Sequence, residues 1–352
     1  NQIMTINVPW ESGVKEKLIN AGNIQNSGIE IALNTTPIKK KQWQWDLNFT
    51  YTRNRNKIVE LSPDVTSYIN LDGAANYGNY RIASVAKVGS DYGMLMSDSW
   101  IKTDEKTGKP VVGYTNKFRT VYYKRGGTVK EVGSMLPNFL GSLNSTLRWK
   151  DLSLYVLFDA RFGGYVASYN SRYATAYGFS GETEKYRKGM TWTSKYANAQ
   201  DKVFTDGFIP DVVFDAGTIV TTPGGTNQDV SGMTYQEAYE KGYVEPAHLQ
   251  SAAYFKNSWG TGVINDDWFK KINYIALREI TLSYNVPTKI SSYIGAKNIS
   301  LSFTGRNLAY LLNTAPNHEN PESVRGTGAA QFRMRSFMPY TASYLFTLNA
   351  TF

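Results

Sequence analysis

Tyr340-Thr-Ala-Ser-Tyr-Leu-Phe-Thr-Leu-Asn-Ala-Thr-Phe352 is the stretch of sequence that decides the fold of this chain. Counted back from Phe352, every second residue is apolar or aromatic, and the residues between them mostly carry hydroxyl or amide groups. Side chains alternate between the two faces of a strand, so the stretch predicts one apolar face and one polar face. Such a strand fits the edge of a soluble β-sandwich. It also fits a transmembrane β-barrel, whose strands cross the bilayer in about ten residues.

The composition is compatible with a membrane barrel and argues against several other classes of protein. The chain has 352 residues, of which 14% are aromatic, and it has no cysteine, so neither disulfides nor thiolate metal sites are expected. No apolar run approaches the roughly 20 residues that a transmembrane helix needs. The net charge is +9, but the basic residues are scattered apart from Lys39-Lys-Lys41. We therefore expect no nucleic-acid partner.

Alternation of the same kind recurs along the chain and predicts seven membrane strands. Their expected ranges are 24–37, 43–57, 138–149, 152–162, 270–286, 298–308 and 340–352. Residues 1–22 lack the pattern and are expected to be irregular. Arg278 falls among the apolar positions of its strand, which predicts either a β-bulge or a residue above the membrane.

The connections between these strands sort by length. Short ones lie at 38–42, 150–151 and 287–297, and long ones at about 59–136, 163–267 and 309–338. If Phe352 ends at the periplasm, every short connection is periplasmic and every long one is extracellular, as in bacterial barrels. A structureless loop as long as 163–267, with one helical turn expected near Tyr235–Glu240, would be unusual in a soluble domain. The sorting favours the barrel over the sandwich.

Seven strands do not make a complete barrel, because single-chain bacterial barrels have even strand numbers. We therefore expect an all-β fold in which residues 1–352 form the C-terminal portion of a larger transmembrane antiparallel β-barrel. The remaining strands would lie outside this chain and would pair with its two open edges.

Several motifs together resemble a known family. They are Asn20-Ala-Gly-Asn-Ile-Gln-Asn-Ser-Gly-Ile-Glu30, Trp45-Asp-Leu-Asn-Phe49 with Asn56-Lys-Ile-Val-Glu-Leu61, Ala276-Leu-Arg-Glu-Ile-Thr-Leu-Ser-Tyr-Asn-Val-Pro287 and Phe303-Thr-Gly-Arg-Asn-Leu308. In combination they resemble the SusC-like TonB-dependent transporters of Bacteroidetes, over most of the chain except its two longest loops. The chain departs from that family at Tyr123-Lys-Arg-Gly-Gly-Thr128, where many members carry an acidic stretch, so the resemblance does not favour a calcium site there.

The resemblance implies a 22-stranded, plugged barrel in the outer membrane of a Gram-negative, Bacteroidetes-like bacterium. It implies active import of oligosaccharides or peptides beneath a SusD-like surface lipoprotein that acts as a lid. TonB would act through an N-terminal segment that, like the plug and the N-terminal strands, is not in this sequence. Two alternatives stay open, namely a passive outer-membrane porin and a soluble β-sandwich that binds glycans or acts as an adhesin.

The alternation also assigns residues to the two faces of the predicted barrel. The charged residues expected to face the lumen, and therefore the substrate path or the plug, are Glu30, Asp46, Asp159, Arg161 and Arg306. The aromatic residues expected to form the lipid-facing periplasmic girdle are Trp43, Trp45, Trp149, Tyr284 and Phe352. His248 and His318 are the only histidines, and both lie in predicted loops. Their isolation predicts no catalytic site, no metal site and no cofactor, so we expect no enzyme.

Overall fold

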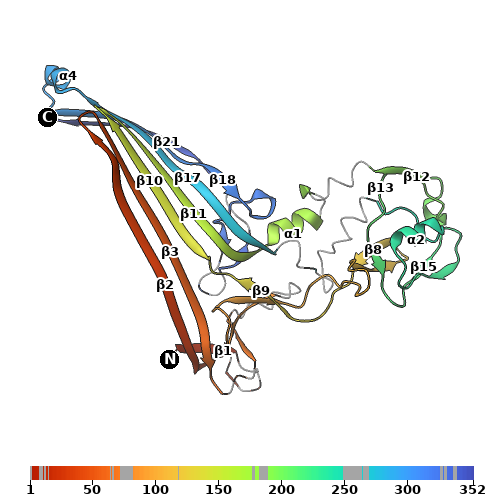
Figure 1. Cartoon of the computed structure of the whole chain (residues 1–352). Helices are drawn as coiled ribbons and strands as arrows, with labels where there is room; N and C mark the ends of the chain where they lie inside the picture. The colour runs from red at the N-terminus through yellow and green to blue at the C-terminus, as the bar shows by residue number, and fades with distance from the viewer. Residues whose placement is uncertain are drawn as a thin grey trace.

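The segments with alternating sequence form one antiparallel sheet (Figure 1). In spatial order its main strands are β1 (Gln2–Asn7), β2 (Glu16–Lys40), β3 (Trp43–Leu61), β10 (Phe139–Trp149), β11 (Leu152–Ser168), β17 (Phe269–Val286), β18 (Asn298–Asn313) and β21 (Ser343–Thr351). This computed structural model describes residues 2–352 apart from 8–10, 12, 15, 64, 66, 72–81, 118, 177–178, 182–188, 249–263, 265–268, 326–327, 329–330 and 336–338. Within that part of the chain the sheet is open, with β1 and β21 at its edges.

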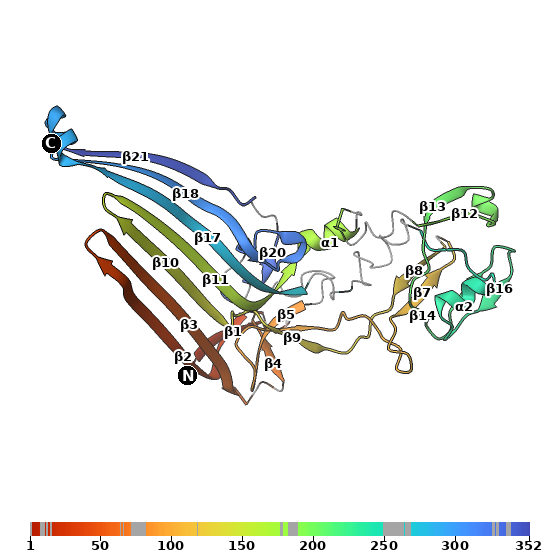
Figure 2. The same ribbon diagram turned by 45° about the horizontal axis from the view of Figure 1, so that its top comes forward.

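The short connections gather at one end of the sheet and the long ones at the other (Figures 1 and 2). Residues 150–151 join β10 to β11 as a two-residue turn between the paired Trp149 and Leu152, and Lys150 has the positive φ of 53° that such turns favour. The first long connection is 62–138, the second 169–268 and the third 314–342. Lys41 and Gln42 join β2 to β3, and the connection between β17 and β18 holds α4 (Thr288–Ser291) and a 3₁₀ turn, Ser292–Ile294.

Several strands are longer than the alternation predicts. Residues 1–22 were expected to be irregular, which is wrong, because β1 and the first part of β2 pair there. The strand expected at 152–162 continues to Ser168, and the one expected at 298–308 continues to Asn313, whereas the last strand is shorter than 340–352. Val166 and Ala167 show the reason, since these consecutive residues are both buried. An extension buried on both faces carries no alternation to detect.

The buried cores lie at the end of the sheet that carries the long connections. One cluster joins the strand ends to the first and third connections through Ile82, Leu95, Met135, Ala167, Tyr169, Phe269 and Phe332. The first connection supplies a small sheet of β4 (Tyr68–Asn70), β5 (Ile82–Lys87), β6 (Met94–Ser97) and β9 (Lys130–Ser134). Other elements at this end are α1 (Tyr169–Ala176), a 3₁₀ turn (Pro316–His318), β19 (Val324–Arg325) and β20 (Arg333–Met334), of which β20 pairs with the end of β11.

Parts of the first and second connections fold together into a separate body, here called the loop module and defined as residues 99–125 and 189–248. Its elements are β7 (Val111–Thr115), β8 (Thr120–Tyr123), β12 (Met190–Thr193), a 3₁₀ turn (Ala197–Ala199), β13 (Val203–Gly207), β14 (Val213–Phe214), β15 (Ile219–Thr221), β16 (Asn227–Asp229) and α2 (Tyr235–Glu240). Figure 1 shows the loop module projecting away from the sheet. The predicted helical turn near 235–240 is confirmed, and a capping box between Thr234 and Glu237 begins it.

The two halves of the loop module share one core. β14 of the second connection pairs in parallel with β7 of the first, Val213 with Val111 and Phe214 with Val112. The buried cluster takes residues from both connections: Val112, Val121, Val212, Phe214, Val220, Val230, Tyr235, Ala238, Val244 and Ala247. Lys102 also reaches Asp215, with 2.8 Å between Nζ and Oδ1. A long loop therefore gains its own core, which explains why it does not stay structureless.

Among the described residues, no helix is both long enough and apolar enough to span a bilayer.

Candidate substrate path and loop pocket

One face of the sheet is apolar, aromatic and uncovered. Phe303, Phe346 and Phe352 are 54%, 72% and 70% exposed, and nothing in the described part of the chain shields them. In a soluble sandwich this face would be buried against a second sheet. An exposed aromatic surface that continues from strand to strand is the surface that lipid covers in a membrane barrel.

The residues predicted for the aromatic girdle all lie on this face beside the short turns: Trp43, Trp45, Trp149, Tyr284 and Phe352. Trp43 and Trp149 are cross-strand partners whose rings stack with 5.6 Å between centroids. Four of the five are exposed, whereas Trp45 is partly buried and donates its indole N–H to Ser145 Oγ at 2.9 Å. Their contact with lipid headgroups stays a prediction.

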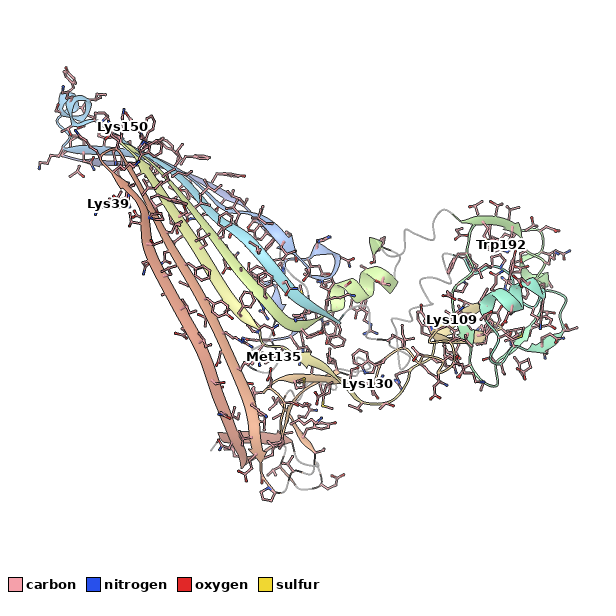
Figure 3. All side chains as sticks on the ribbon, viewed as in Figure 1. Lys39, Lys109, Lys130, Met135, Lys150 and Trp192 are labelled. Carbon is pink, nitrogen blue, oxygen red and sulfur yellow. The ribbon has the colours of Figure 1, made fainter. Side chains whose placement is uncertain are left out.

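The opposite face is polar and internally hydrogen-bonded. Hydroxyl pairs bridge neighbouring strands: Thr50–Ser142 at 2.6 Å, Thr281–Thr304 at 2.9 Å and Ser283–Ser302 at 2.8 Å. Such cross-strand pairs stabilise a sheet with a polar face, because each hydroxyl forms a hydrogen bond with a hydroxyl on the neighbouring strand. This polar face is the candidate lining of a substrate path. Figure 3 shows side chains standing out from both sides of the sheet.

The five predicted lumen residues share this polar face, but the structure does not bring them into one cluster. Asp46 lies near the short turns, where it pairs with Arg148 Nη1 at 2.5 Å and accepts a hydrogen bond from Thr36. Arg306 donates from Nε to Glu279 Oε2 at 2.9 Å, and Glu30 is exposed on β2. These groups form separate pairs along a wall, so their role in substrate contact stays a prediction.

The strongest charge cluster on the polar face centres on a residue that breaks the alternation. The register of β17 shifts between Leu277 and Glu279, so Arg278 is the extra residue of a β-bulge, the first of the two alternatives that the sequence left open. The bulge turns Arg278 toward the polar face, where its Nη2 lies 2.7 Å from Asp159 Oδ2 and 2.6 Å from Glu322 Oε1. Glu322 belongs to the third connection, so this cluster ties a loop to the wall of the sheet.

The sequence did not single out Glu322, because nothing in its local pattern distinguishes it from other loop carboxylates. Tyr310 donates its hydroxyl to Glu322 Oε2 at 2.8 Å. Burial raises the pKa of the Glu322 carboxyl, but the hydrogen bonds from Arg278 and Tyr310 outweigh burial and hold the pKa below its ordinary value. The group therefore stays charged, as its role opposite a guanidinium requires.

Arg161, also predicted to face the lumen, is used to hold the end of its own strand. Gly163 and Gly164 have φ of +89° and +88°, and a Cβ on Gly164 would come within 2.7 Å of the Met135 carbonyl oxygen. This kink lets Arg161 donate to the carbonyl oxygens of Gly163 and Met135, both at 3.3 Å. Arg161 thus joins β11 to the first connection rather than standing free in a lumen.

A second buried carboxylate joins the third connection to β11. Glu319 is 7% exposed and accepts a hydrogen bond from Ser168 Oγ at 2.8 Å. Burial raises the pKa of Glu319 to about 7, and the hydrogen bond from Ser168 offsets only part of that shift. The same serine accepts the backbone N–H of Ser171 in α1 at 3.0 Å. Glu319 therefore links the third connection to the start of the second, and the charge of its carboxyl changes near neutral pH.

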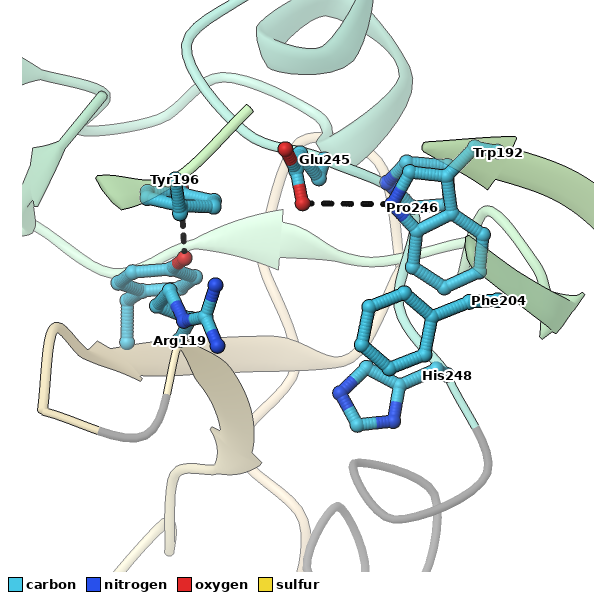
Figure 4. Close-up of a pocket in the computed structure, with 8 residues that line it drawn as sticks. Arg119, Trp192, Tyr196, Phe204, Glu245, Pro246 and His248 are labelled. Carbon is cyan, nitrogen blue, oxygen red and sulfur yellow. Dashed lines mark hydrogen bonds between the residues drawn. The ribbon is translucent and has the colours of Figure 1, made fainter. Parts of the chain in front are cut away.

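The loop module contains a pocket that alternation could not reveal (Figure 4). Trp192, Phe204 and His248 form an aromatic cluster, in which the ring centroids of Phe204 lie 4.7 Å from Trp192 and 5.1 Å from His248, and those of Trp192 and His248 lie 6.1 Å apart. Glu245 accepts hydrogen bonds from Trp192 Nε1 at 3.3 Å and from Ser194 Oγ at 2.8 Å. Burial lowers the pKa of His248, which favours a neutral imidazole in this cluster.

The two histidines lie in different parts of the structure. His318 is exposed in the third connection, and His248 stacks on Phe204 in the loop module. Within the described ranges, no group of three His, Cys, Asp or Glu side chains could hold a metal ion.

Comparison with known proteins confirms the resemblance drawn from the motifs. The chain is 22% identical over 313 residues to a TonB-dependent receptor of Formosa agariphila, a match that covers 87% of this chain and 26% of the receptor. No family model matches the chain. The curated relative is a receptor by name rather than an enzyme.

Solved structures show the same fold. The structure of the RagAB peptide transporter aligns with 100% of this chain and 32% of the matched chain, with a TM-score of 0.58 and 14% identity. The RagAB peptide importer in its "open-open" state aligns with a TM-score of 0.58 and 13% sequence identity, over 31% of its chain. The antiparallel sheet therefore has the fold of part of an outer-membrane transporter barrel. The chain spans between a quarter and a third of the length of these relatives.

Proposed function

We propose that this chain forms part of the barrel wall and the extracellular loops of a TonB-dependent transporter that imports peptides across the outer membrane. The observation that carries the proposal is the pairing of an uncovered aromatic face with a hydrogen-bonded polar face on one sheet. Lipid would cover the first face and the solute would pass along the second. The sequence resemblance to a TonB-dependent receptor adds the coupling to energy.

The choice of peptides rests on the peptide transporters whose fold the sheet shares. Oligosaccharides are the second candidate substrate, because aromatic side chains of the loop pocket, such as Trp192 and Phe204, offer flat faces on which sugar rings also stack. A passive porin is the third candidate, and it needs neither an energy source nor a lid.

A surface lipoprotein of the SusD type is the proposed partner at the extracellular end, with TonB acting through a part of the protein that precedes this chain. Support comes from the loop module, which projects beyond the sheet on the side of the long connections (Figure 2). A body with its own core extends well past what bilayer crossing requires, and such a body is suited to contact another protein. We expect it to hold the lipoprotein and to shape the entrance to the substrate path.

Uptake by cells tests the proposal directly. Cells that carry the intact transporter should accumulate a labelled peptide mixture only when TonB and the proton-motive force are present. Equal uptake without TonB would favour the passive porin, and uptake of oligosaccharides in place of peptides would change the substrate class. Replacing residues 189–248 by a short Gly-Ser linker should abolish co-purification of the lipoprotein or the uptake. If both persist, the loop module has neither proposed role.

A further inference from the structure

Arg119 is a cation in the loop module that has no acidic partner among the described residues. It lies between β7 and β8, and its guanidinium carbon lies 4.8 Å from the centroid of the Tyr196 ring. The Nε atom is buried and has no hydrogen-bond partner in the described part of the chain. A buried N–H without an acceptor is costly, and the cost is larger for a charged group. The Nε atom itself is closed to a ligand, but the Arg119 side chain lines two hollows, so a ligand in either hollow can supply the missing countercharge.

Glu245 is the carboxylate in the same pocket, but its oxygens already accept hydrogen bonds from other groups. The donors are Trp192 Nε1, Ser194 Oγ and the backbone N–H of Lys195, the last at 2.5 Å. These bonds fix Glu245 as part of the pocket wall. Figure 4 shows the Arg119 guanidinium between Tyr196 and the Phe204–His248 stack, with Glu245 turned toward Trp192.

Arg119 is shared by two adjoining hollows. On one side lies the pocket with the aromatic cluster of Trp192, Phe204 and His248. On the other lies an open groove of about 460 Å³, whose lining includes Lys195, Asn198, Gln200 and the turn at 222–225. The groove is within the size range of small-molecule sites, and its lining combines apolar surface with the side-chain amides of Asn116, Asn198 and Gln200. Its two cationic side chains are Arg119 and Lys195.

We propose that Arg119 anchors a carboxylate of the transported solute, and that the groove holds the chain next to that carboxylate. The inference rests on the proposed function and makes its substrate class narrower, namely peptides with a free C-terminal or side-chain carboxylate. The planar guanidinium can bind a carboxylate through two parallel hydrogen bonds. Because the guanidinium already stacks on Tyr196, it loses less conformational entropy when it binds the ligand. Lys195 adds a second positive charge at the groove, which favours the same ligands.

Matched ligands test the anchor without any mutation. The intact transporter in detergent should bind a peptide with a free C-terminus more tightly than the same peptide with a C-terminal amide. The expected difference is roughly ten- to a hundred-fold, the range for a hydrogen bond to a charged group. Equal binding of the two peptides would overturn the proposal. Galacturonate oligomers and neutral oligosaccharides form a second pair of ligands, and a carboxylate preference seen only there would replace peptides by acidic sugars.

Substitution then assigns the preference to Arg119. Arg119→Gln should remove the preference for the free carboxylate while leaving the affinity for the amidated peptide unchanged, and Arg119→Lys should retain part of it. Lys241→Gln is the matched control, because it removes one exposed positive charge from the same loop module, outside both hollows. The anchor would be refuted if Arg119→Gln still bound the free-carboxylate peptide more tightly than the amidated one. It would also be refuted if the only effect of Arg119→Gln were to weaken binding of the lipoprotein. TonB-dependent uptake without carboxylate preference would overturn this inference alone, whereas loss of TonB dependence would overturn the proposed function.

Discussion

Glu319 should make the docking of the third long connection depend on pH. Glu319 is 7% exposed as a residue, and the pKa of its carboxyl is raised to about 7 from 4.5 by burial. When the loop undocks, the group returns to water and to its ordinary pKa. The docked state therefore binds more protons than the undocked state between these two values, and docking weakens as the pH rises.

The size of the effect follows from the two pKa values. Each pKa unit corresponds to about 1.36 kcal/mol, so docking should lose about 3 kcal/mol in all. The stabilisation is fully present below about pH 4.5 and is lost by about pH 7. Glu319→Gln should remove the slope, because an amide keeps a polar group opposite Ser168 Oγ and does not titrate in this range.

Hydrogen exchange gives the measurement. Protection of the backbone N–H groups of residues 169–176 and 314–322, corrected for the intrinsic pH dependence of exchange, should fall steadily between pH 4.5 and 7 in the unmodified transporter. His318→Gln is the matched control, since this exposed neighbour lies in the same turn. Protection that does not fall with pH, or the same slope in Glu319→Gln, would refute the argument.

Three further substitutions test the cores and faces described above. Phe214→Ala should cost the loop module about 3–4 kcal/mol, since this side chain is buried in the core shared by both connections. Proteolysis should then cut 99–125 as well as 189–248 while the sheet stays intact, and cleavage confined to one segment would contradict a shared core. Arg278→Gln should weaken docking of the third connection by about 1–2 kcal/mol, a value lowered by partial exposure of the cluster. Exchange in residues 320–325 reports it, and Arg306→Gln, whose acceptor lies within the sheet, should leave that exchange unchanged. In single-tryptophan variants, brominated lipid should quench Trp43 strongly and leave Trp192 unquenched, and equal quenching would argue against a lipid-facing girdle.

Much of the sheet could be predicted because a strand between lipid and a wet lumen must alternate. The hairpin of β10 and β11 follows its predicted bounds closely, from Phe139 to Trp149 and from Leu152 onward. Arg278 could be recognised as a bulge for the same reason, since one residue out of register shifts every later side chain to the other face. Alternation reports only where the two environments differ, so it missed β1, whose partner in β2 extends beyond the strictly alternating part.

The candidate sites were harder to predict, because their partners lie far apart in the sequence. Alternation places Asp159 and Arg161 on the polar face, but it does not show that the first pairs with Arg278 and Glu322 or that the second binds backbone carbonyls. Those partners come from a bulge and from a glycine kink. Each depends on tertiary contacts rather than on a local periodicity.

The loop module shows why the long connections carry so little readable pattern. Its core takes Val112 and Val121 from the first connection and most of its other residues, such as Phe214 and Val220, from the second. The parallel pairing of β14 with β7 spans about a hundred residues of chain, and it forms only when two loops meet above the same sheet. Residues that pack in this way need no amphipathic period of their own. The pocket is lined by Tyr114 and Arg119 from the first connection and by Trp192, Tyr196 and Glu245 from the second, so this candidate recognition site depends on both loops.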